Sequence, residues 1–334
     1  MINKSSLTIT LASNKYGYGH FKRMFNFKTK LASHNIKNYI THFDNYNLFL
    51  NKKKISINYL SNFILEKNIQ LLILDLSNSK FLKNKIFLKL INFISNQNLS
   101  VIIFDDFTKE IHENLRFFPK NIVICPYVYE DKFLKIKKKK YKSLLVGTKY
   151  SILPQHKKIR NRNNKLKKIL ISCGGTDFKN LTVKLIKILK VYDYLKIFVI
   201  VGPHFKKKEK DKIYNFKQKN LKIYYNAENI NKIAEKCDFA IITSGLTKYE
   251  LLSIGMRFAV ISENKEFYKF HYPFSKRKFC YDLGYYQSFN ILKKRIKKLI
   301  DKYDNLEELT NQKDIDTKGA ERIIKIIKQK FLKK

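Results

Sequence analysis

The sequence predicts an α/β protein with two Rossmann-like domains, each built on a mainly parallel sheet. Short apolar runs alternate along the chain with longer amphipathic ones, and the apolar runs lack the polar alternation of half-exposed strands. Three of these runs end in glycine-containing turns that precede a helix-like segment. Such a rhythm is typical of doubly wound sheets, and 334 residues suffice for two hydrophobic cores.

The apolar runs give the expected strands in chain order. In the first half these are residues 7–12, 71–75, 101–105, 122–125 and 144–146. In the second half they are residues 169–173, 197–202, 222–225, 239–243 and 258–262. Helices are expected over residues 80–96, 180–190, 229–236 and 246–254. After Asn290 the chain is expected to be helical to its end, with a final amphipathic helix over residues 318–331.

A polar break separates the two sets of strands. Residues 155–168, QHKKIRNRNNKLKK, are basic and have no apolar periodicity. We therefore expect an N-terminal domain over residues 1–155, a linker over 156–167 and a C-terminal nucleotide-binding domain over 168–334 that includes the terminal helices. Two doubly wound domains predict a ligand cleft between the carboxyl edges of their sheets.

The formal net charge of +42 rests on lysine, because arginine occurs at only eight positions. Lys, Asn, Ile, Phe and Tyr are all abundant and Trp is absent, as an AT-rich coding genome would produce. Solvated lysines are the first interpretation, and an anionic nucleotide, membrane surface or nucleic acid is the alternative. A nucleic-acid partner is not expected, since it leaves the three glycine turns unexplained.

Cysteine spacing and hydropathy restrict the cellular setting. Cys125, Cys173, Cys237 and Cys280 show no CxxC spacing, so free thiols in a reducing cytosol are expected and zinc is not. No apolar run approaches the roughly 20 residues that span a bilayer, and no signal peptide is recognised. A cytoplasmic protein is expected, with its oligomeric state open.

The first glycine turn is Gly17-Tyr18-Gly19-His20-Phe21-Lys22-Arg23, between a strand and a helix. Two glycines let the backbone approach a ligand closely, and a helix start attracts anions. His20 has a side chain that titrates near neutral pH and is the candidate general base.

The second turn is Cys173-Gly174-Gly175-Thr176-Asp177. The amides of Gly174 and Gly175 with the Thr176 hydroxyl are suited to a diphosphate. The alternative is a tight turn in which Asp177 caps the next helix.

The third turn is Thr243-Ser244-Gly245-Leu246-Thr247, followed by Glu250 one helical turn later. Ser244, Gly245 and Thr247 would donate to phosphate oxygens, and Glu250 would accept from ribose hydroxyls. The alternative is a capping box between Thr247 and Glu250.

Together, GYGHFKR, CGGTDFKN and TSGLTKYE resemble the nucleotide-sugar hydrolases of pseudaminic acid biosynthesis, relatives of the family-28 (MurG-like) glycosyltransferases with the GT-B fold. Further matching pieces are residues 104–106, 146–150 and 318–322, so the resemblance runs from about residue 7 to 325.

The resemblance implies hydrolysis of a UDP-linked diacetamido-trideoxy-hexose at the anomeric carbon with inversion. It implies His20 as the general base and no cofactor or metal. The nucleotide side would comprise Gly174, Gly175, Thr176, Ser244, Gly245, Thr247 and Glu250. The sugar side would comprise Gly17, Gly19, Arg23, Asp105, Asp106 and Asn264. Asp105 or Asp106 would orient the imidazole or contact the sugar, or else cap the strand end.

Two positions depart from the family pattern. Asp75-Leu76-Ser77 stands where the family has Asp-x-Tyr, and Asn264-Lys265 stands where it has Asn-Gln. These changes fall on the sugar side and leave open the exact sugar and whether water is the acceptor. A glycosyltransferase that uses a UDP-sugar donor is therefore the first alternative. A non-catalytic nucleotide-sugar-binding protein is the second.

Overall fold

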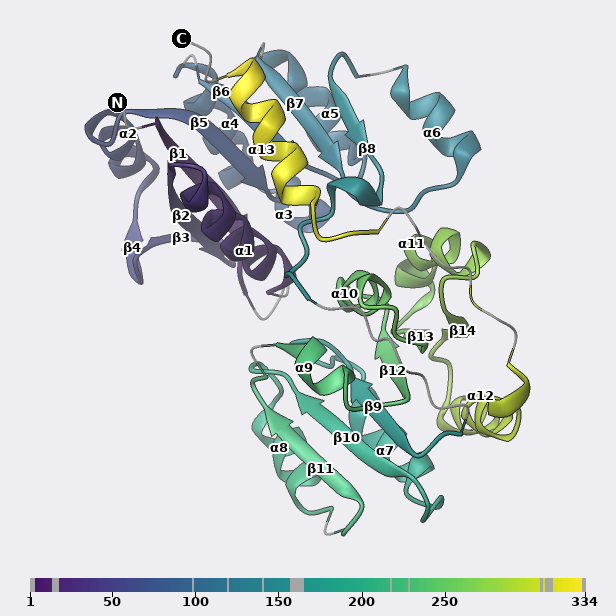
Figure 1. Ribbon diagram of the computed structural model, residues 1–334. Helices are drawn as coiled ribbons and strands as arrows, with labels where there is room; N and C mark the ends of the chain where they lie inside the picture. Colours follow the sequence, from purple (N-terminus) through teal and green to yellow (C-terminus); the bar gives the residue numbers. More distant parts are fainter. Residues whose placement is uncertain are drawn as a thin grey trace. The chain divides into compact units, whose positions relative to one another are not determined.

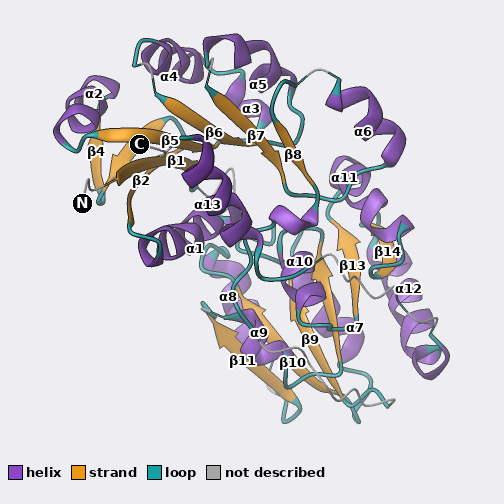
Figure 2. Ribbon diagram, turned by 45° about the horizontal axis from the view of Figure 1, so that its top comes forward, coloured by secondary structure: helices purple, strands orange, loops and turns teal. Residues whose placement is uncertain are grey.

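The computed structural model describes residues 4–13, 18–97, 99–118, 120–139, 141–156, 165–216, 218–227, 229–306, 309 and 315–331. The chain divides into two compact units (Figure 1). Unit 1 comprises Met1–Pro154 and Asp316–Lys334, and unit 2 comprises Gln155–Ile315. Each unit is built on one sheet with helices on both faces (Figure 2).

The sheet of unit 1 has eight strands in the order β4-β3-β2-β1-β5-β6-β7-β8. Strand pairs are parallel except at the hairpins β2–β3 and β3–β4. The strands are β1 Lys4–Leu11, β2 Ile36–Asp44, β3 Asn47–Leu50, β4 Lys53–Ile55, β5 Ile69–Asp75, β6 Ser100–Phe104, β7 Asn121–Cys125 and β8 Leu144–Val146.

Helices of unit 1 cover both faces of this sheet. They are α1 Gly19–Ser33, α2 Ile57–Glu66, α3 Ser79–Leu82, α4 Lys85–Ser95, α5 Lys109–Asn114, α6 Asp131–Lys138 and α13 Gly319–Lys330. Short 3₁₀ turns span Leu115–Phe117 and Thr148–Tyr150. Helix α4 shows why such a segment folds: Asn84 Oδ1 accepts from Ile86 N at its start, and its buried residues recur at helical spacing.

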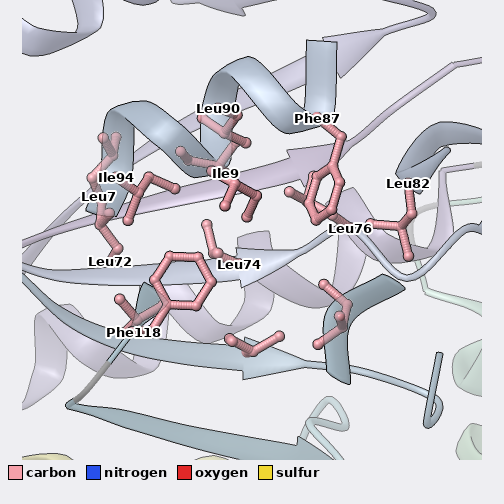
Figure 3. Packing of buried hydrophobic residues seen from close by; sticks show 14 of the residues in the cluster. Leu7, Ile9, Leu72, Leu74, Leu76, Leu82, Phe87, Leu90, Ile94 and Phe118 are labelled. Atoms are coloured by element: carbon pink, nitrogen blue, oxygen red, sulfur yellow. The ribbon is translucent and has the colours of Figure 1, made fainter. Parts of the chain in front are cut away.

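Alternate residues of the central strands enter two different cores. Leu72 and Leu74 of β5 pack with α4, as do Leu7 and Ile9 of β1 (Figure 3). Leu71 and Ile73, which point to the other face, pack in a cluster with residues of α1 and α13. Both faces of β5 are therefore covered, which explains its nearly continuous apolar sequence.

The C-terminal helix α13 belongs to unit 1, where it lies beside α1 (Figure 1). The expectation that residues 168–334 form one domain with its terminal helices is wrong for this helix. Ala320, Ile323, Ile324 and Ile327 pack into the core under α1. The amphipathic pattern of α13 indicated an apolar face, but it carried no information about which sheet that face would cover.

Gly319 fixes the start of α13 against residues 148–151. A Cβ at Gly319 would lie 2.1 Å from the carbonyl oxygen of Ser151, which no side chain tolerates. Three residues further on, Arg322 donates to the carbonyl oxygen of Lys149 at 3.0 Å and forms an ion pair with Asp316. These contacts hold the returning chain on unit 1.

The sheet of unit 2 has six parallel strands in the order β11-β10-β9-β12-β13-β14. Ranked by sequence, this is the 3-2-1-4-5-6 order of a dinucleotide-binding fold. The strands are β9 Lys168–Ser172, β10 Lys196–Val201, β11 Leu221–Tyr225, β12 Phe239–Thr243, β13 Phe258–Ser262 and β14 Tyr281–Tyr285. The helices are α7 Leu181–Leu189, α8 Lys207–Tyr214, α9 Ile230–Ala234, α10 Thr247–Ser253, α11 Lys265–Lys276 and α12 Phe289–Asp301, with a 3₁₀ turn at Tyr303–Asn305.

The predicted fold class, α/β with two mainly parallel sheets, is confirmed. The hairpin strands β2 to β4 and the edge strand β14 were not predicted. β2 alternates buried and more exposed residues, and the β3–β4 turn uses Asn51 and Lys52 at φ of 50° and 67°. Most of the expected linker, residues 157–164, lies outside the described residues. Among the described residues, no helix is both long and apolar enough to cross a bilayer.

Candidate active site

The candidate catalytic group of unit 1 lies at the carboxyl edge of its sheet, between β1 and β5. The parallel strands run in the order β2-β1-β5-β6-β7-β8, so the chain leaves β1 and β5 toward opposite sides. Such a switch in strand order opens a crevice at the carboxyl ends of the two strands. His20, in the first turn of α1 after β1, and Asp75, the last residue of β5, meet here.

His20, Arg23 and Asp75 form one hydrogen-bonded group. His20 Nδ1 lies 2.7 Å from Asp75 Oδ1. Arg23 donates to both carboxylate oxygens, from Nη2 to Oδ1 at 2.6 Å and from Nε to Oδ2 at 3.0 Å. The i, i+3 spacing on α1 places His20 and Arg23 on the same helix face, so both reach one carboxylate.

Burial and pairing keep Asp75 and Arg23 ionised. Asp75 is completely buried, and the side chain of Arg23 is 4% exposed. Burial alone would raise the pKa of Asp75, but the charges of Arg23 and His20, with their hydrogen bonds, hold it below its ordinary value. Burial likewise disfavours the charged form of Arg23, but Asp75 and Tyr127 together raise the pKa of the guanidinium above its ordinary value.

The arrangement sets the tautomer of His20. An ionised carboxylate only accepts hydrogen bonds, so the proton of the neutral imidazole resides on Nδ1 and is donated to Asp75. Nε2 then carries a lone pair. Because the side chain of His20 is 19% exposed, the ring is open to solvent while its other end is fixed. This is the arrangement of an oriented general base.

Tyr127, which follows β7, supports Arg23 from the other side. Its Oη accepts from Arg23 Nη1 at 2.6 Å. The guanidinium lies over the rings of Tyr127 and Phe104, 5.6 Å and 5.3 Å from their centroids. Burial raises the pKa of Tyr127 to about 12, so the phenol keeps its proton at neutral pH.

The carboxylates predicted to orient His20 belong to a neighbouring network. Asp105 accepts from the backbone N–H and the hydroxyl of Thr108, at 2.9 Å and 2.7 Å, and from Ser77 Oγ. Asp106 accepts from the hydroxyl of Tyr129 at 2.6 Å. The orienting role is therefore corrected from Asp105 or Asp106 to Asp75, and Asp105 has the alternative role of a cap at a strand end.

Of the two glycines before His20, the structure describes only the second. Gly17 lies outside the described residues. Gly19 is the exposed first residue of α1, whose N-cap Tyr18 makes no side-chain cap bond. No acidic residue occurs in the first turn of this helix. The start of α1 therefore keeps the favourable setting for a negative charge that the sequence indicated.

The glycine turns of unit 2 follow β9 and β12, the two strands at its own switch point. Gly174 adopts φ +76°, which favours glycine. Gly175 and Gly245 have no such requirement, and a Cβ at either would meet no atom of the described residues within 4 Å. At Gly175 and Gly245, therefore, neither the backbone conformation nor packing against the protein requires a glycine, whereas the close approach of a ligand would require one.

Gly202, at the end of β10, supports the first of these turns. A Cβ at Gly202 would lie 2.4 Å from the carbonyl oxygen of Gly174 and 2.6 Å from that of Gly175. The N–H of His204 also donates to the carbonyl oxygen of Gly175 at 3.0 Å. The turn is therefore held from behind by the backbone of the neighbouring loop.

Asp177 closes the start of α7. Its carboxylate accepts from the backbone N–H groups of Leu181 and Thr182 at 2.7 Å and 2.8 Å. The capping alternative is confirmed for this residue. An anion at this turn would depend on the glycine amides and Thr176, which is partly exposed, rather than on the first amides of α7.

At the third turn, Thr247 does not occupy the N-cap position that the capping-box alternative requires. Helix α10 begins after Leu246, which makes no side-chain cap bond, so Thr247 is its first residue and not a capping residue. Ser244 and Thr247 are partly exposed, Gly245 is exposed and Glu250 is buried. Asn264 lies in the same unit, where its Oδ1 accepts from Phe267 N and caps α11.

Four residues that bear on these sites were not predicted: Asp75, Tyr127, Gly202 and Glu263. Asp75 ends an apolar strand that pairs with β1. An acidic residue at the end of an apolar strand is the sequence feature that could have identified it as a site residue. Tyr127 of unit 1 follows β7, and Gly202 and Glu263 of unit 2 follow β10 and β13, so the strand order within each sheet decides where each of them lies. Among the described residues, no group of three or more His, Cys, Asp or Glu could hold a metal ion.

The chain has the GT-B fold, as comparison with solved structures shows. MurG of Acinetobacter baumannii superposes with a TM-score of 0.61 at 14% identity, over 98% of this chain and 99% of that one. UDP-GlcNAc 2-epimerase of Neisseria meningitidis, bound to UDP-GlcNAc, gives 0.57 at 12%, over 96% and 98%. The spinosyn rhamnosyltransferase SpnG, complexed with thymidine diphosphate, gives 0.60 at 10%, over 97% and 96%.

Sequence comparison adds less. An uncharacterized protein of Methanocaldococcus jannaschii is 29% identical over 189 residues. The match covers 55% of this chain and 36% of that relative, so it spans about a third of the relative's length. No protein-family model matches the chain.

Proposed function

We propose that the protein hydrolyses a UDP-linked diacetamido-trideoxy-hexose at the anomeric carbon, with inversion, and releases UDP and the free sugar. The observation that carries this proposal is His20, held by the buried Asp75–Arg23 pair with Nε2 available as a base. The resemblance of the three glycine-turn motifs supports the choice of substrate. The fold supports it too, because two neighbours are described with a nucleotide or a nucleotide sugar bound.

In the proposed reaction, Nε2 of His20 takes a proton from water as the water oxygen forms a bond to the anomeric carbon. The bond from that carbon to the phosphate oxygen breaks, and UDP departs with the electron pair. Asp75 stabilises the imidazolium that forms, because the ring gains its charge beside a carboxylate already ionised by Arg23.

Unit 2 would hold the nucleotide. The open backbone at Gly175 and Gly245, with Gly174, Thr176, Ser244 and Thr247, would donate hydrogen bonds to the diphosphate. Glu250 would accept from the ribose. These assignments rest on the sheet-edge position of the two turns and on the space at their glycines.

A glycosyltransferase is the second candidate, favoured by the transferases among the structural neighbours. His20 would then deprotonate an acceptor hydroxyl in place of water. A screen of UDP-sugars, with UDP release measured with and without glycan or lipid acceptors, separates the two. The hydrolase releases UDP from a diacetamido-trideoxy-hexose donor without an acceptor, whereas release only after an acceptor is added would establish the transferase.

A non-catalytic binding protein is the third candidate. It would bind UDP-sugars without releasing UDP under either condition. The intact His20–Asp75–Arg23 group argues against it, because a buried ion pair beneath a partly exposed imidazole is costly to retain without a use.

A further inference from the structure

Glu263 follows β13 at the edge of the sheet that carries both glycine turns of unit 2. Three paired residues mark one level across β9, β12 and β13: Ser172, Ile242 and Val260. Gly175, Gly245 and Glu263 each come three residues after this level. The strand register therefore brings a carboxyl group to the edge where the two turns lie.

Among the described residues, no contact indicates a structural role for the Glu263 carboxyl. It makes no hydrogen bond or ion pair with any of them, and its side chain is half-buried. Asp177, by contrast, is buried, and both of its carboxylate oxygens accept hydrogen bonds from backbone amides of α7. Glu263 thus remains available to a ligand.

The surroundings of Glu263 disfavour its charged form. Burial and, to a smaller extent, the charge of Asp177 raise its pKa to about 7, against the opposing charge of Lys179. The buried thiol of Cys173 also lies within electrostatic range. In the first turn of α11, which begins two residues after Glu263, Lys265 and Glu266 are exposed. At neutral pH the carboxyl is therefore divided between its neutral and charged forms.

We propose that Glu263, in its neutral form, donates a hydrogen bond to an anionic oxygen of the ligand held at the two glycine turns. An ionised carboxylate would repel a diphosphate, whereas a carboxylic acid supplies an O–H donor at the same position. Bound phosphate would in turn stabilise the neutral acid. The inference rests on the proposed function, since it concerns the diphosphate of the nucleotide.

UDP binding as a function of pH tests this role. The charge of UDP itself changes little above pH 7, because its terminal phosphate, like a phosphate monoester, loses its second proton at about pH 6. We expect the affinity of the wild type to fall about tenfold from pH 7 to 8.5, since the neutral acid is then lost. Glu263→Gln, which keeps an amide donor at every pH, should show a flat profile. Glu266→Gln, which changes an exposed carboxyl in the first turn of the following helix α11, should retain the wild-type slope.

Calorimetry of UDP binding to the wild type and to Glu263→Gln provides a second test. UDP binding at pH 7, measured in buffers of different ionisation enthalpy, should show proton uptake that Glu263→Gln abolishes. A flat wild-type profile, or one unchanged in Glu263→Gln, overturns the inference and leaves the proposed function standing. Absence of UDP binding at every pH overturns both.

Discussion

Oδ1 of Asp75 lies 2.7 Å from Nδ1 of His20, with the carboxylate completely buried and the imidazole partly exposed. Arg23 donates to both oxygens of the same carboxylate. The imidazole proposed as the general base therefore lies against an ion pair that stays ionised. The relationship depends on strand order, because only the pairing of β1 with β5 brings the two residues together.

Asp75→Asn removes the charge beneath His20 and leaves the size of the side chain unchanged. We expect turnover to fall by about 10³- to 10⁴-fold, since the amide neither fixes the tautomer nor stabilises the imidazolium. UDP affinity should change little, because the proposed nucleotide residues lie in unit 2. Steady-state kinetics and UDP titration measure the two effects, and Asp44→Asn, at the end of β2, is the matched control. Equal losses of affinity and turnover would contradict this role.

Arg23→Met leaves the buried carboxylate of Asp75 without its cation. We expect the free energy of unfolding of unit 1 to fall by about 3–5 kcal/mol at pH 7. The pKa of Asp75 is depressed in the folded wild type, so its ionisation stabilises the fold above the unfolded pKa, and this contribution is lost as pH falls through the folded value. The penalty in the variant should therefore shrink on acidification, when Asp75 can be protonated.

Urea unfolding at neutral and acid pH checks this expectation. Lys109→Met is the control, because its ion pair with Glu113 is exposed and should contribute less than about 1 kcal/mol. A penalty for Arg23→Met that is independent of pH would show that lost packing, rather than the charge of Asp75, causes the effect.

Two glycine variants separate a binding role from a packing role. Gly175→Ala should fold with nearly wild-type stability but bind UDP more weakly, since its Cβ meets no described atom and would enter the proposed diphosphate position. Gly202→Ala should be destabilised by about 1–3 kcal/mol, because its Cβ would strike the carbonyl oxygens of Gly174 and Gly175. Thermal unfolding and UDP titration distinguish them. Unchanged affinity in Gly175→Ala would remove this turn from the nucleotide site.

Gly319→Ala tests the attachment of α13 to unit 1. The new Cβ would lie 2.1 Å from Ser151 O, so the helix start must move and its apolar face must shift in the core. We expect a loss of about 1–3 kcal/mol or more in the stability of unit 1. Hydrogen exchange should show the loss in α1 and α13 and leave unit 2 unaffected. Destabilisation confined to unit 2 would contradict the assignment.

Much of the fold was predictable because burial on both faces leaves a continuous apolar signal. Strands such as Leu144–Val146, Phe239–Thr243 and Phe258–Ser262 were predicted with the bounds that the structure has. The hairpin β2–β4 was not, because a partly exposed strand mixes polar and apolar residues and gives a weaker period.

The site was less predictable than the fold. His20 was recognised from its motif, but its partner Asp75 is 55 residues away and depends on strand order. The local pattern at Asp177 fitted both a phosphate turn and a helix cap, and only the hydrogen bonds to α7 decide for the cap. Sequence spacing therefore indicated where the loops lie, whereas the pairing of side chains across strands required the structure.

The proposed hydrolysis, with His20 as its base, is tested by comparing the wild type with His20→Ala in the release of UDP from a UDP-linked diacetamido-trideoxy-hexose without an acceptor. His34→Ala, at the other end of α1, is the control. We expect turnover by the wild type and His34→Ala, near-complete loss in His20→Ala and unchanged UDP binding in all three. Wild-type-like turnover by a folded His20→Ala protein would contradict this expectation.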